Sequence, residues 1–501
     1  MPNFAAYLPD RPTLPDRPTL PSAKLLRIEL LAGLVVALAL IPEAISFSII
    51  AGVDPRVGLF ASFTMAVAIA FTGGRPAMIS AATGAMALVV VSLISDHGVE
   101  YLLAATILAG AIQIALGLLG VAKLMRFVPR SVMTGFVNAL AILIFLAQLP
   151  HLTDGGAAVY ALVAAGLAVM YLLPKMTKVV PAPLVAIVLL TVVCVVGGVG
   201  VPMVGDEGKL PDALPILGIP AVPFSLETLT IIAPYSFTLA VVGLLESLMT
   251  AKLVDDITET GSDKDRESRG QGIANVITGF FGGMAGCAMI GQTMINVRTS
   301  GARTRISTFC AGAFLLVLVV GLGSVVAVIP MAALVAVMIL VAVSTFDWHS
   351  IAPSTLRRIP RGETVVMAVT VAGTVATHNL AIGVGAGVLT AMAVFARRVA
   401  HLVEVDRVVD PDGSSCLYSV HGEVFFASDQ ELIEAFRYAE DPSRVIIDFS
   451  RAHLWDASAI AAVDAIEGHY RRHDIEVSIT GLNDRSDALH QRLSGQMAAT
   501  H

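Results

Sequence analysis

Two acidic residues, Glu43 and Glu246, stand inside long apolar stretches of this 501-residue chain. Glu43 lies in Leu38-Ala-Leu-Ile-Pro-Glu-Ala-Ile-Ser-Phe47, and Glu246 lies in Val241-Val-Gly-Leu-Leu-Glu-Ser-Leu248. A carboxylate in the middle of a membrane span is costly and by default marks a functional site. We therefore interpret both glutamates as candidate binding or proton-carrying groups.

Two glycine-containing stretches resemble each other. The first is Phe71-Thr-Gly-Gly-Arg-Pro-Ala-Met-Ile79, and the second is Phe280-Phe-Gly-Gly-Met-Ala-Gly-Cys-Ala-Met-Ile290. Irregular backbone at membrane depth is tolerated only where protein buries it or water reaches it. Glycine-interrupted segments at matching places of two halves point to the midplane site of a transporter.

The composition sets the class of protein. Hydrophobic residues make up 56% of the chain and charged residues only 14%, whereas soluble domains average about 25% charged. This predicts a polytopic α-helical membrane protein. The four cysteines are scattered, which predicts neither a metal site nor a disulfide. No paired-acid or nucleophile constellation suggests an enzyme, and we expect no nucleic-acid partner. The cysteines are Cys194, Cys287, Cys310 and Cys416.

The apolar segments predict fourteen membrane spans. Two of them, 83–95 and 291–303, are shorter than the ~20 residues of a full span, and each follows one of the glycine stretches. We interpret them as half-helices that begin at the midplane. The other spans are 27–50, 57–72, 101–121, 129–149, 156–173, 181–200, 232–252, 269–283, 306–328, 331–345, 363–378 and 381–398.

Basic residues predict the orientation. With the N-terminus inside, 22 lysines and arginines up to residue 400 fall in cytosolic segments and only Arg56 and Lys209 fall outside. This asymmetry follows the positive-inside rule. It places both termini in the cytoplasm, predicts a cell inner (plasma) membrane location, and gives the two half-helices opposite directions. A seven-plus-seven inverted repeat accounts for all of these features.

The chain divides into three parts. Residues 1–23 are rich in proline and predict an extended, disordered tail. Residues 24–400 form the transport domain, with halves at about 24–203 and 230–400. Residues 401–501 carry more charge and predict a small cytosolic α/β domain. In that domain Val445–Phe449 and Glu476–Thr480 are expected strands, and Trp455–Ile466 is expected to be a turn capping an amphipathic helix.

These residues together resemble the SulP (sulfate permease) family of anion transporters, which contains relatives of pendrin and prestin. The C-terminal part resembles a STAS domain, with Asp448 and Asp456-Ala-Ser458. The resemblance implies a core domain and a gate domain, and homodimers. The stretches that carry it are Ile41-Pro-Glu-Ala-Ile-Ser-Phe-Ser-Ile-Ile-Ala-Gly52, Gly58-Leu-Phe-Ala-Ser62, Ser80-Ala-Ala-Thr83, Gly270-Gln-Gly-Ile-Ala-Asn275, Gly282-Gly-Met-Ala-Gly286 and Asn296-Val-Arg-Thr-Ser-Gly-Ala-Arg-Thr304.

The resemblance also implies a site between the facing starts of the third and tenth spans, beside the first and eighth. Free N–H groups at two helix starts attract an anion without a buried arginine. A STAS domain further implies a cytosolic regulator, and Ser458 is a candidate phosphorylation site or simply a residue of the first helical turn. The implied substrate-binding residues are Glu43, Phe47, Thr83, Gly84, Ala85, Glu246, Gly291, Gln292 and Thr293.

Two positions depart from the family pattern. Many relatives have glutamine in place of Glu43, and many have Ser-Arg in place of Gly291-Gln292. Two ionised glutamates would repel an anion, and protonation removes that repulsion. We therefore expect symport of a small anion with a proton, with Glu246 and Glu43 as proton carriers, no other cofactor, and sodium as the alternative coupling ion.

The substrate stays open at this point. A site without arginine fits a carboxylate or dicarboxylate somewhat better than chloride, while the family also handles sulfate and bicarbonate, by sodium coupling or exchange. A nucleobase permease of the same architecture would need an acid in the tenth span, where this chain has Gln292. An anion channel would favour arginine at that position. His151 and His378 fall singly in predicted outside loops.

Overall fold

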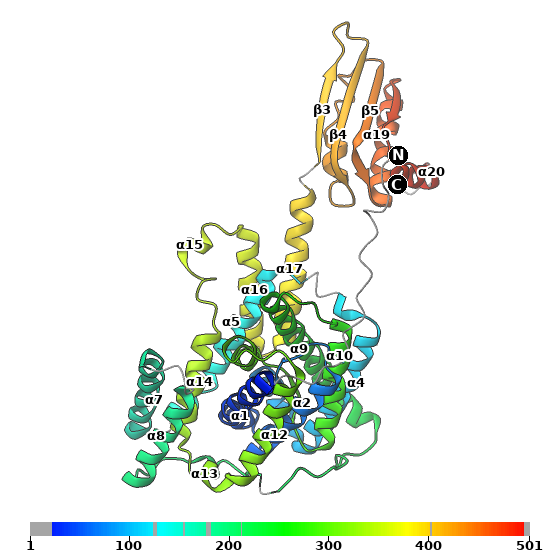
Figure 1. Ribbon diagram of the computed structural model, residues 1–501. Helices are drawn as coiled ribbons and strands as arrows, with labels where there is room; N and C mark the ends of the chain where they lie inside the picture. The colour runs from blue at the N-terminus through cyan, green and yellow to red at the C-terminus, as the bar shows by residue number, and fades with distance from the viewer. Residues whose placement is uncertain are drawn as a thin grey trace. The chain divides into compact units, whose positions relative to one another are not determined.

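The computed structural model describes residues 23–123, 128–153, 156–176, 182–211, 213–400 and 403–494, in two compact units, Met1–Gly387 and Val388–His501. The predicted tail therefore lies almost wholly outside the described residues. Helices dominate the first unit (Figure 1). They are α1 (Ala23–Ala51), α2 (Pro55–Thr72), α3 (Gly84–His97), α4 (Val99–Leu118), α5 (Arg130–Leu146), α6 (Leu149–Thr153), α7 (Gly156–Met176), α8 (Ala182–Gly197), η3 (Val204–Asp206), α9 (Leu226–Thr258), α10 (Lys264–Phe280), α11 (Ile290–Met294), η4 (Ile295–Thr299), α12 (Arg305–Gly321), α13 (Gly323–Ala327), α14 (Met331–Thr345), α15 (Pro353–Leu356), α16 (Arg361–Thr377) and α17 (Leu380–Ala400).

Each of the fourteen predicted spans coincides with a helix. In the described part of the chain, seven helices are long and apolar enough to cross a membrane, and α3, α8, α12 and α14 are shorter apolar helices. The number of crossings therefore stays a prediction. The long helices form because alanine, leucine and other apolar residues fill them, and their backbone groups are satisfied within the helix.

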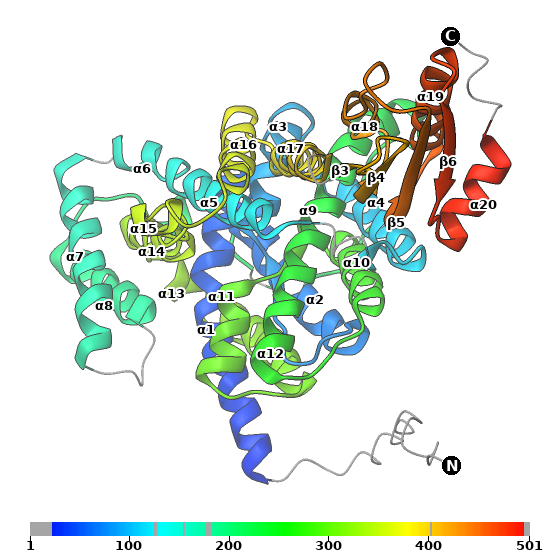
Figure 2. The same ribbon diagram turned by 90° about the horizontal axis from the view of Figure 1, so that it is seen from above.

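The helices pack in two groups. In one group α1 packs on α2 and α12, and α10 packs on α2, α4 and α9. In the other group α5 packs on α14 and α16, and α7 packs on α8 and α14. Figure 2 shows α7, α8 and α14 on one side and α2, α10 and α12 on the other. The groups correspond to the core and gate domains that the family resemblance implies.

A two-stranded ribbon lies within the core group. Strands β1 (Ser80–Ala82) and β2 (Gly286–Ala288) pair antiparallel, with Ala81 opposite Cys287. The sequence did not predict these strands, because three residues are too few to show an alternating pattern. The ribbon joins the two halves of the chain at the points where α3 and α11 begin.

The tenth predicted span is shorter than expected. The helix begins with α11 at Ile290 and continues as the π-helix η4 only to Thr299, so the predicted end at residue 303 is wrong. Buried Glu29 explains the difference, because its Oε1 accepts the backbone N–H groups of Arg303 at 2.7 Å and Thr304 at 3.0 Å. These bonds hold the residues before α12 as its cap. The predicted span 306–328 is also divided, since α12 ends at Gly321 and α13 follows.

The second unit contains a four-stranded sheet in the order β3-β4-β5-β6, in which β3 and β4 are antiparallel and the other pairs parallel. Tyr418, Phe449 and Tyr470 are buried in its core. Both predicted strands and the predicted helix are confirmed, and Asp456 caps α19 by accepting the N–H of Ala459 at 3.0 Å. The elements are β3 (Glu404–Val409), β4 (Ser415–Val424), α18 (Asp429–Glu434), β5 (Arg444–Leu454), α19 (Ala457–Arg472), β6 (Glu476–Thr480) and α20 (Asp484–Leu493).

Candidate functional site

The glycine pairs before the ribbon permit close backbone contact. A Cβ on Gly74 would collide with the carbonyl oxygen of Asp263, and a Cβ on Gly283 would come within 2.8 Å of the Ala61 backbone. Glu267 reinforces the first contact, since its Oε2 accepts the N–H of Gly74 at 2.7 Å. Both predicted glycine stretches therefore lead into the ribbon through tightly packed turns.

The Ala-Met-Ile triplets of the two stretches do not occupy equivalent places. Ala77-Met-Ile79 precedes β1, whereas Ala288-Met-Ile290 ends β2 and opens α11. The structural correspondence between the halves is strand followed by helix. The strand and the helix each begin three residues sooner after the second glycine pair than after the first, so an alignment on the Ala-Met-Ile triplets hides this correspondence.

Glu43 and Gln292 form one contact between the halves. Glu43 lies on α1 and is partly exposed, and its Oε1 accepts a hydrogen bond from Nε2 of Gln292 on α11 at 2.7 Å. The Gln292 side chain is 2% exposed. Its Oε1 is buried and has no hydrogen-bond partner among the described residues. The sequence predicted both residues as site residues but not their contact.

Glu246 and Thr83 form a second contact between the halves, through a thiol. Glu246 on α9 is 6% exposed, and its Oε2 accepts a hydrogen bond from Sγ of Cys287 at 2.9 Å. The same Sγ lies 3.3 Å from Oγ1 of Thr83. Cys287 is fully buried in β2 and was not predicted as a site residue. Its place between the second glycine pair and α11 was the available signal.

The two threonines of the site use their hydroxyls for local structure as well. Oγ1 of Thr83 caps α3 by accepting the N–H of Met86 at 3.4 Å. Oγ1 of Thr293 accepts the N–H of Ile79 at 3.0 Å and is fully buried. Thr83 therefore lies beside Glu246 through Cys287, whereas the hydroxyl of Thr293 ties α11 to the residue before β1.

Phe47, Gly84 and Ala85 pack at the start of α3. Phe47 is 3% exposed and Ala85 is fully buried. A Cβ on Gly84 would lie 3.0 Å from Cε1 of Phe47 and 3.2 Å from Cδ1 of Ile144, which belongs to α5. In contrast, Gly291 is exposed and a Cβ there would meet nothing within 4 Å. The start of α3 is thus closed by side chains, while α11 begins beside open space.

Residues outside the predicted set hold the ribbon in place. Oδ1 of Asn275 accepts the N–H of Gly286 at 2.8 Å, and Nδ2 donates to the same residue's carbonyl at 3.0 Å. Nδ2 also donates to Gln113 at 2.9 Å, and the N–H of Ala288 donates to Oγ of Ser247 at 3.0 Å. Asn275 ends a stretch that resembles the family. No sequence pattern indicates that its side chain binds the backbone of the ribbon.

A cavity of about 920 Å³ lies beside the site. It is lined by residues of α1, α3 and α9 from one group and by residues around α5 and α16 from the other. Leu88, one turn beyond Gly84, is part of its wall. His151 and His378, which the sequence placed in separate loops, both line this cavity. It separates the two helix groups and approaches the start of α3.

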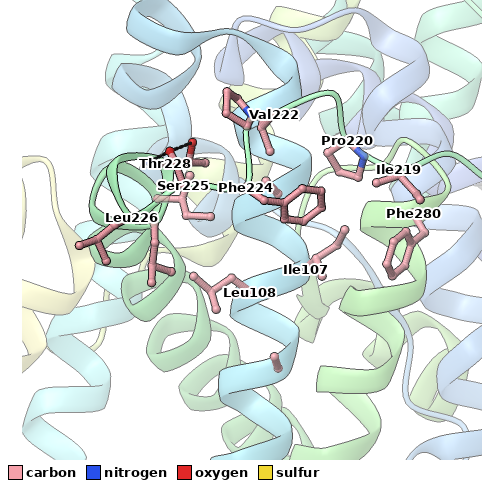
Figure 3. A pocket seen from close by; sticks show the side chains of 15 residues that line it. Ile107, Leu108, Ile219, Pro220, Val222, Phe224, Ser225, Leu226, Thr228 and Phe280 are labelled. Carbon is pink, nitrogen blue, oxygen red and sulfur yellow. Dashed lines mark hydrogen bonds between the residues drawn. The ribbon is translucent and has the colours of Figure 1, made fainter.

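A second cavity, of about 530 Å³, is apolar (Figure 3). Ile107, Leu108, Phe224 and Phe280 line it, and the hydroxyls of Ser225 and Thr228 are 3.2 Å apart at its edge. No ionisable side chain is among its lining residues.

In the second unit, Ser458 lies in the first turn of α19 and is partly buried. Both carboxylate oxygens of the preceding Asp456 are used, because Oδ1 accepts from Ala459 and Oδ2 accepts the N–H of Phe426 at 2.9 Å. The capping role of Asp456 is thus clear. The regulatory role of Ser458 stays a prediction.

Comparison with known proteins agrees with the arrangement. The family model described as "Sulfate permease family" matches residues 26–164 and 156–370, and the model described as "STAS domain" matches residues 403–494. YbaR of Bacillus subtilis (strain 168) is 54% identical over 469 residues, which cover 94% of this chain and 97% of YbaR. The bicarbonate transporter BicA of Picosynechococcus is 26% identical, covering 88% of this chain and 86% of BicA.

Solved structures share the fold. The transmembrane domain of a cyanobacterial BicA has a TM-score of 0.63 at 25% identity and covers 74% of this chain and 98% of that chain. The murine solute carrier 26 family member A9, in the inward-facing state, has a TM-score of 0.77 at 16% identity and covers 93% and 87%.

Two helix groups, one of which contains the ribbon, followed by an α/β domain, define a multi-pass membrane transporter with a C-terminal STAS domain. The chain belongs to the sulfate permease family.

Proposed function

We propose that this anion transporter carries a small carboxylate or dicarboxylate together with a proton, by alternating access of the core group against the gate group. The observation that carries the proposal is the pair of carboxylates, Glu43 and Glu246, whose recorded partners are an amide and a thiol. Among the described residues neither has a lysine or arginine partner.

Neither the amide nor the thiol neutralises the charge of an ionised carboxylate. An ionised carboxylate without a cation is costly to hold away from water, and two of them would repel an anion. Binding a proton at either residue lowers that cost and that repulsion together. Anion and proton therefore favour each other in the same site, and this mutual preference is the thermodynamic requirement for symport.

The cavity between the two helix groups supports alternating access. Residues of both groups line it, and it extends toward the start of α3. Gly84 meets Phe47 and Ile144 closely at that start. A displacement of the core group against the gate group would change this contact and open or close a path to the ribbon.

Uptake into proteoliposomes tests the proposal. Labelled fumarate, sulfate and bicarbonate are offered separately, with an inward proton gradient, the same gradient collapsed by an ionophore, and a sodium gradient. We expect accumulation of fumarate that requires the proton gradient. Uptake that ignores the gradient but requires a counter-anion inside the vesicles would replace symport with exchange.

Bicarbonate transport is the second candidate, because BicA matches this chain over most of both lengths. The name of YbaR refers to sulfate transport, which makes sulfate the third member of the panel. Proton-driven accumulation of bicarbonate or sulfate in place of fumarate would keep the coupling and change the substrate. A homodimer and a regulator bound by the STAS domain stay predictions.

A further inference from the structure

The amide of Gln292 uses only one of its two ends. Its Nε2 donates to Oε1 of Glu43 at 2.7 Å, while its own Oε1 is buried and the described protein supplies no donor to it. A buried acceptor left without a donor costs about 1–3 kcal/mol. Buried acceptors in native structures are ordinarily hydrogen-bonded. The free oxygen of Gln292 therefore points to a donor that it gains during the transport cycle.

The elements packed around Glu43 and Gln292 carry further ionisable groups. Helix α1 packs against α2, α3, α8, α12, α14, α11, η4 and β1, and α11 packs also against α9. Cys287, five residues before Gln292 in the chain, and Glu246, which Cys287 contacts at 2.9 Å, are the titratable groups of the second contact. The other charged or titratable groups of these elements are Lys24, Arg27, Glu29, Arg56, Asp96, His97, Cys194, Glu227, Tyr235, Lys252, Asp255, Asp256, Arg298, Arg305 and Cys310.

Two of the arginines among these groups have partners of their own, and Arg298, six residues after Gln292, is exposed. Arg305 of α12 donates to the carbonyl of Ala70 at 3.2 Å and to that of Gly73 at 2.6 Å. Arg56 of α2 pairs with Asp54 at 3.3 Å. The protonation state of Glu43 is therefore set by its burial, by Gln292 and by what enters the site.

An amide can form a hydrogen bond with either the ionised or the protonated form of a carboxyl group. An ionised carboxylate only accepts hydrogen bonds, whereas a protonated one also donates. With Glu43 ionised, the NH₂ group of Gln292 must face it, as the structure shows. With Glu43 protonated, its O–H can donate to Gln292 Oε1 once the amide turns by half a turn about its last side-chain bond. The NH₂ group is then released.

We propose that Gln292 is the element that couples the proton to the anion, by turning its amide when Glu43 gains a proton. In the ionised state Gln292 holds its carbonyl oxygen toward the site and repels an anion. In the protonated state it presents two N–H donors to the anion. One proton is bound by one carboxylate oxygen, and no other bond forms or breaks. The neighbouring Gly291 borders open space, so an anion can approach.

This inference rests on the proposed function, and it assigns Gln292 a role that a plain amide contact would not have. It also explains how a chain that lacks arginine at this position can bind an anion. The amide supplies donors only when a proton has been bound. A fixed cation would supply them at all times and would remove the coupling.

The test uses the full chain and three variants, with labelled fumarate, or bicarbonate or sulfate if wild-type protein accumulates one of those instead. Glu43→Gln mimics the protonated acid, since its NH₂ group can donate to Gln292 Oε1. Gln292→Arg supplies a permanent donor, and Gln292→Met removes donor and acceptor alike. Glu227→Gln, at an exposed acid in the first turn of α9, is the matched control.

For wild type and the control, we expect the affinity at equilibrium to rise about tenfold for each pH unit lowered, until the acid is fully protonated, as linkage to one proton requires. Glu43→Gln and Gln292→Arg should bind with an affinity independent of pH, and their uptake should ignore the proton gradient. Gln292→Met should bind at least about tenfold more weakly at every pH, the loss expected for a missing charge-assisted hydrogen bond.

The possible failures are distinguishable. Proton-driven wild-type uptake, with the same pH dependence retained in Glu43→Gln or Gln292→Arg, would overturn the switch and leave symport intact. Wild-type uptake without proton drive would overturn both. If Gln292→Arg does not fold, as judged by size-exclusion chromatography, the nearly isosteric Glu43→Gln still decides the outcome.

Discussion

At the scale of single residues, the two glutamates differ in the group that contacts each carboxylate. Glu43 faces the amide of Gln292, whereas Glu246 faces the thiol of Cys287, which also lies 3.3 Å from Thr83. The first contact joins α1 of one half to α11 of the other, whereas Glu246 and Cys287 both belong to the second half and are joined to the first half through Thr83. The side chains that are candidates for binding are therefore the same ones that hold the halves together.

The first prediction concerns Glu246. Glu246→Gln removes the ionisable group while it keeps the size of the side chain, so proton-driven accumulation should fall, while the part that depends on Glu43 should remain. Exchange of labelled for unlabelled anion should continue. Uptake and exchange are measured side by side in proteoliposomes, with Glu227→Gln as the control. Proton-driven accumulation equal to that of wild type would exclude Glu246 as a proton carrier.

The second prediction concerns Cys287. Cys287→Ala removes the donor to Glu246 Oε2, and a hydrogen bond to such a group is worth about 1.5–3 kcal/mol. We expect roughly tenfold or greater loss of uptake at low substrate concentration. Cys287→Ser restores a donor and should recover most of it.

Cys194→Ala is the matched control for Cys287→Ala, because Cys194 is equally buried but belongs to α8. Equal uptake in Cys287→Ala and Cys287→Ser would show that the thiol fills space and does not position the carboxylate.

At the scale of elements, the ribbon of β1 and β2 fixes where α3 and α11 begin. Asn275 and Ser247 bond to the backbone of β2, and Thr293 bonds to the residue before β1. The three-residue strands could not be stable alone in water. Packing of small residues against α2, α9 and α10 makes them stable here.

The third prediction tests the ribbon. A Cβ on Gly286 would collide with the carbonyl oxygen of Ala81 and approach Cγ of Met65 to 2.9 Å. Overpacking of this kind costs about 1–3 kcal/mol, so Gly286→Ala should lower the melting temperature in detergent and reduce uptake. Gly321→Ala, where a Cβ meets nothing within 4 Å, is the control. An unchanged melting temperature would mean that strands β1 and β2 can separate enough to accommodate the added Cβ.

At the scale of the whole molecule, the transport unit and the STAS unit have separate cores. The STAS core contains a buried polar cluster at Asp441. This carboxylate pairs with Arg407 at 2.7 Å and accepts hydrogen bonds from the hydroxyls of Tyr418 at 2.7 Å and Tyr470 at 2.5 Å. Burial and the bond to Asp441 raise the pKa of Tyr418 and of Tyr470. Burial also raises the pKa of Tyr438 to about 12.

The fourth prediction follows from these pKa values. Unfolded tyrosine ionises near pH 10, whereas the folded domain keeps these three protonated at higher pH. The unfolded state then binds fewer protons, so the free energy of unfolding falls as pH rises. The stabilisation is complete below about pH 10 and is lost as pH rises through the higher folded values.

Thermal melting of the purified fragment 403–501, followed by circular dichroism between pH 8 and pH 12, measures this. One kcal/mol corresponds to about 4–8 °C for a domain of this size. Replacing Tyr470 by Phe should flatten the decline above pH 10. A melting temperature that does not fall in this range would contradict the assignment of the tyrosines as buried and protonated.

The sequence by itself determined the class of the protein, the positions of its helical segments and the existence of two short helices after glycine stretches. It could do so because length, hydrophobicity and glycine content are local properties. The same holds for the strands and the capped helix of the STAS domain. Glu43 and Glu246 were identifiable because a charge inside an apolar run is visible without any neighbour.

Only the tertiary structure decided which groups meet. Gln292 reaches Glu43 across 249 positions of the chain, and Thr83 reaches Cys287 across 204. The register of β1 and β2, the early end of η4 caused by Glu29, and the free oxygen of Gln292 depend on the same long-range packing. No local sequence pattern predicts such contacts, because each is formed by two segments that are far apart in the chain and meet only where the two halves pack together.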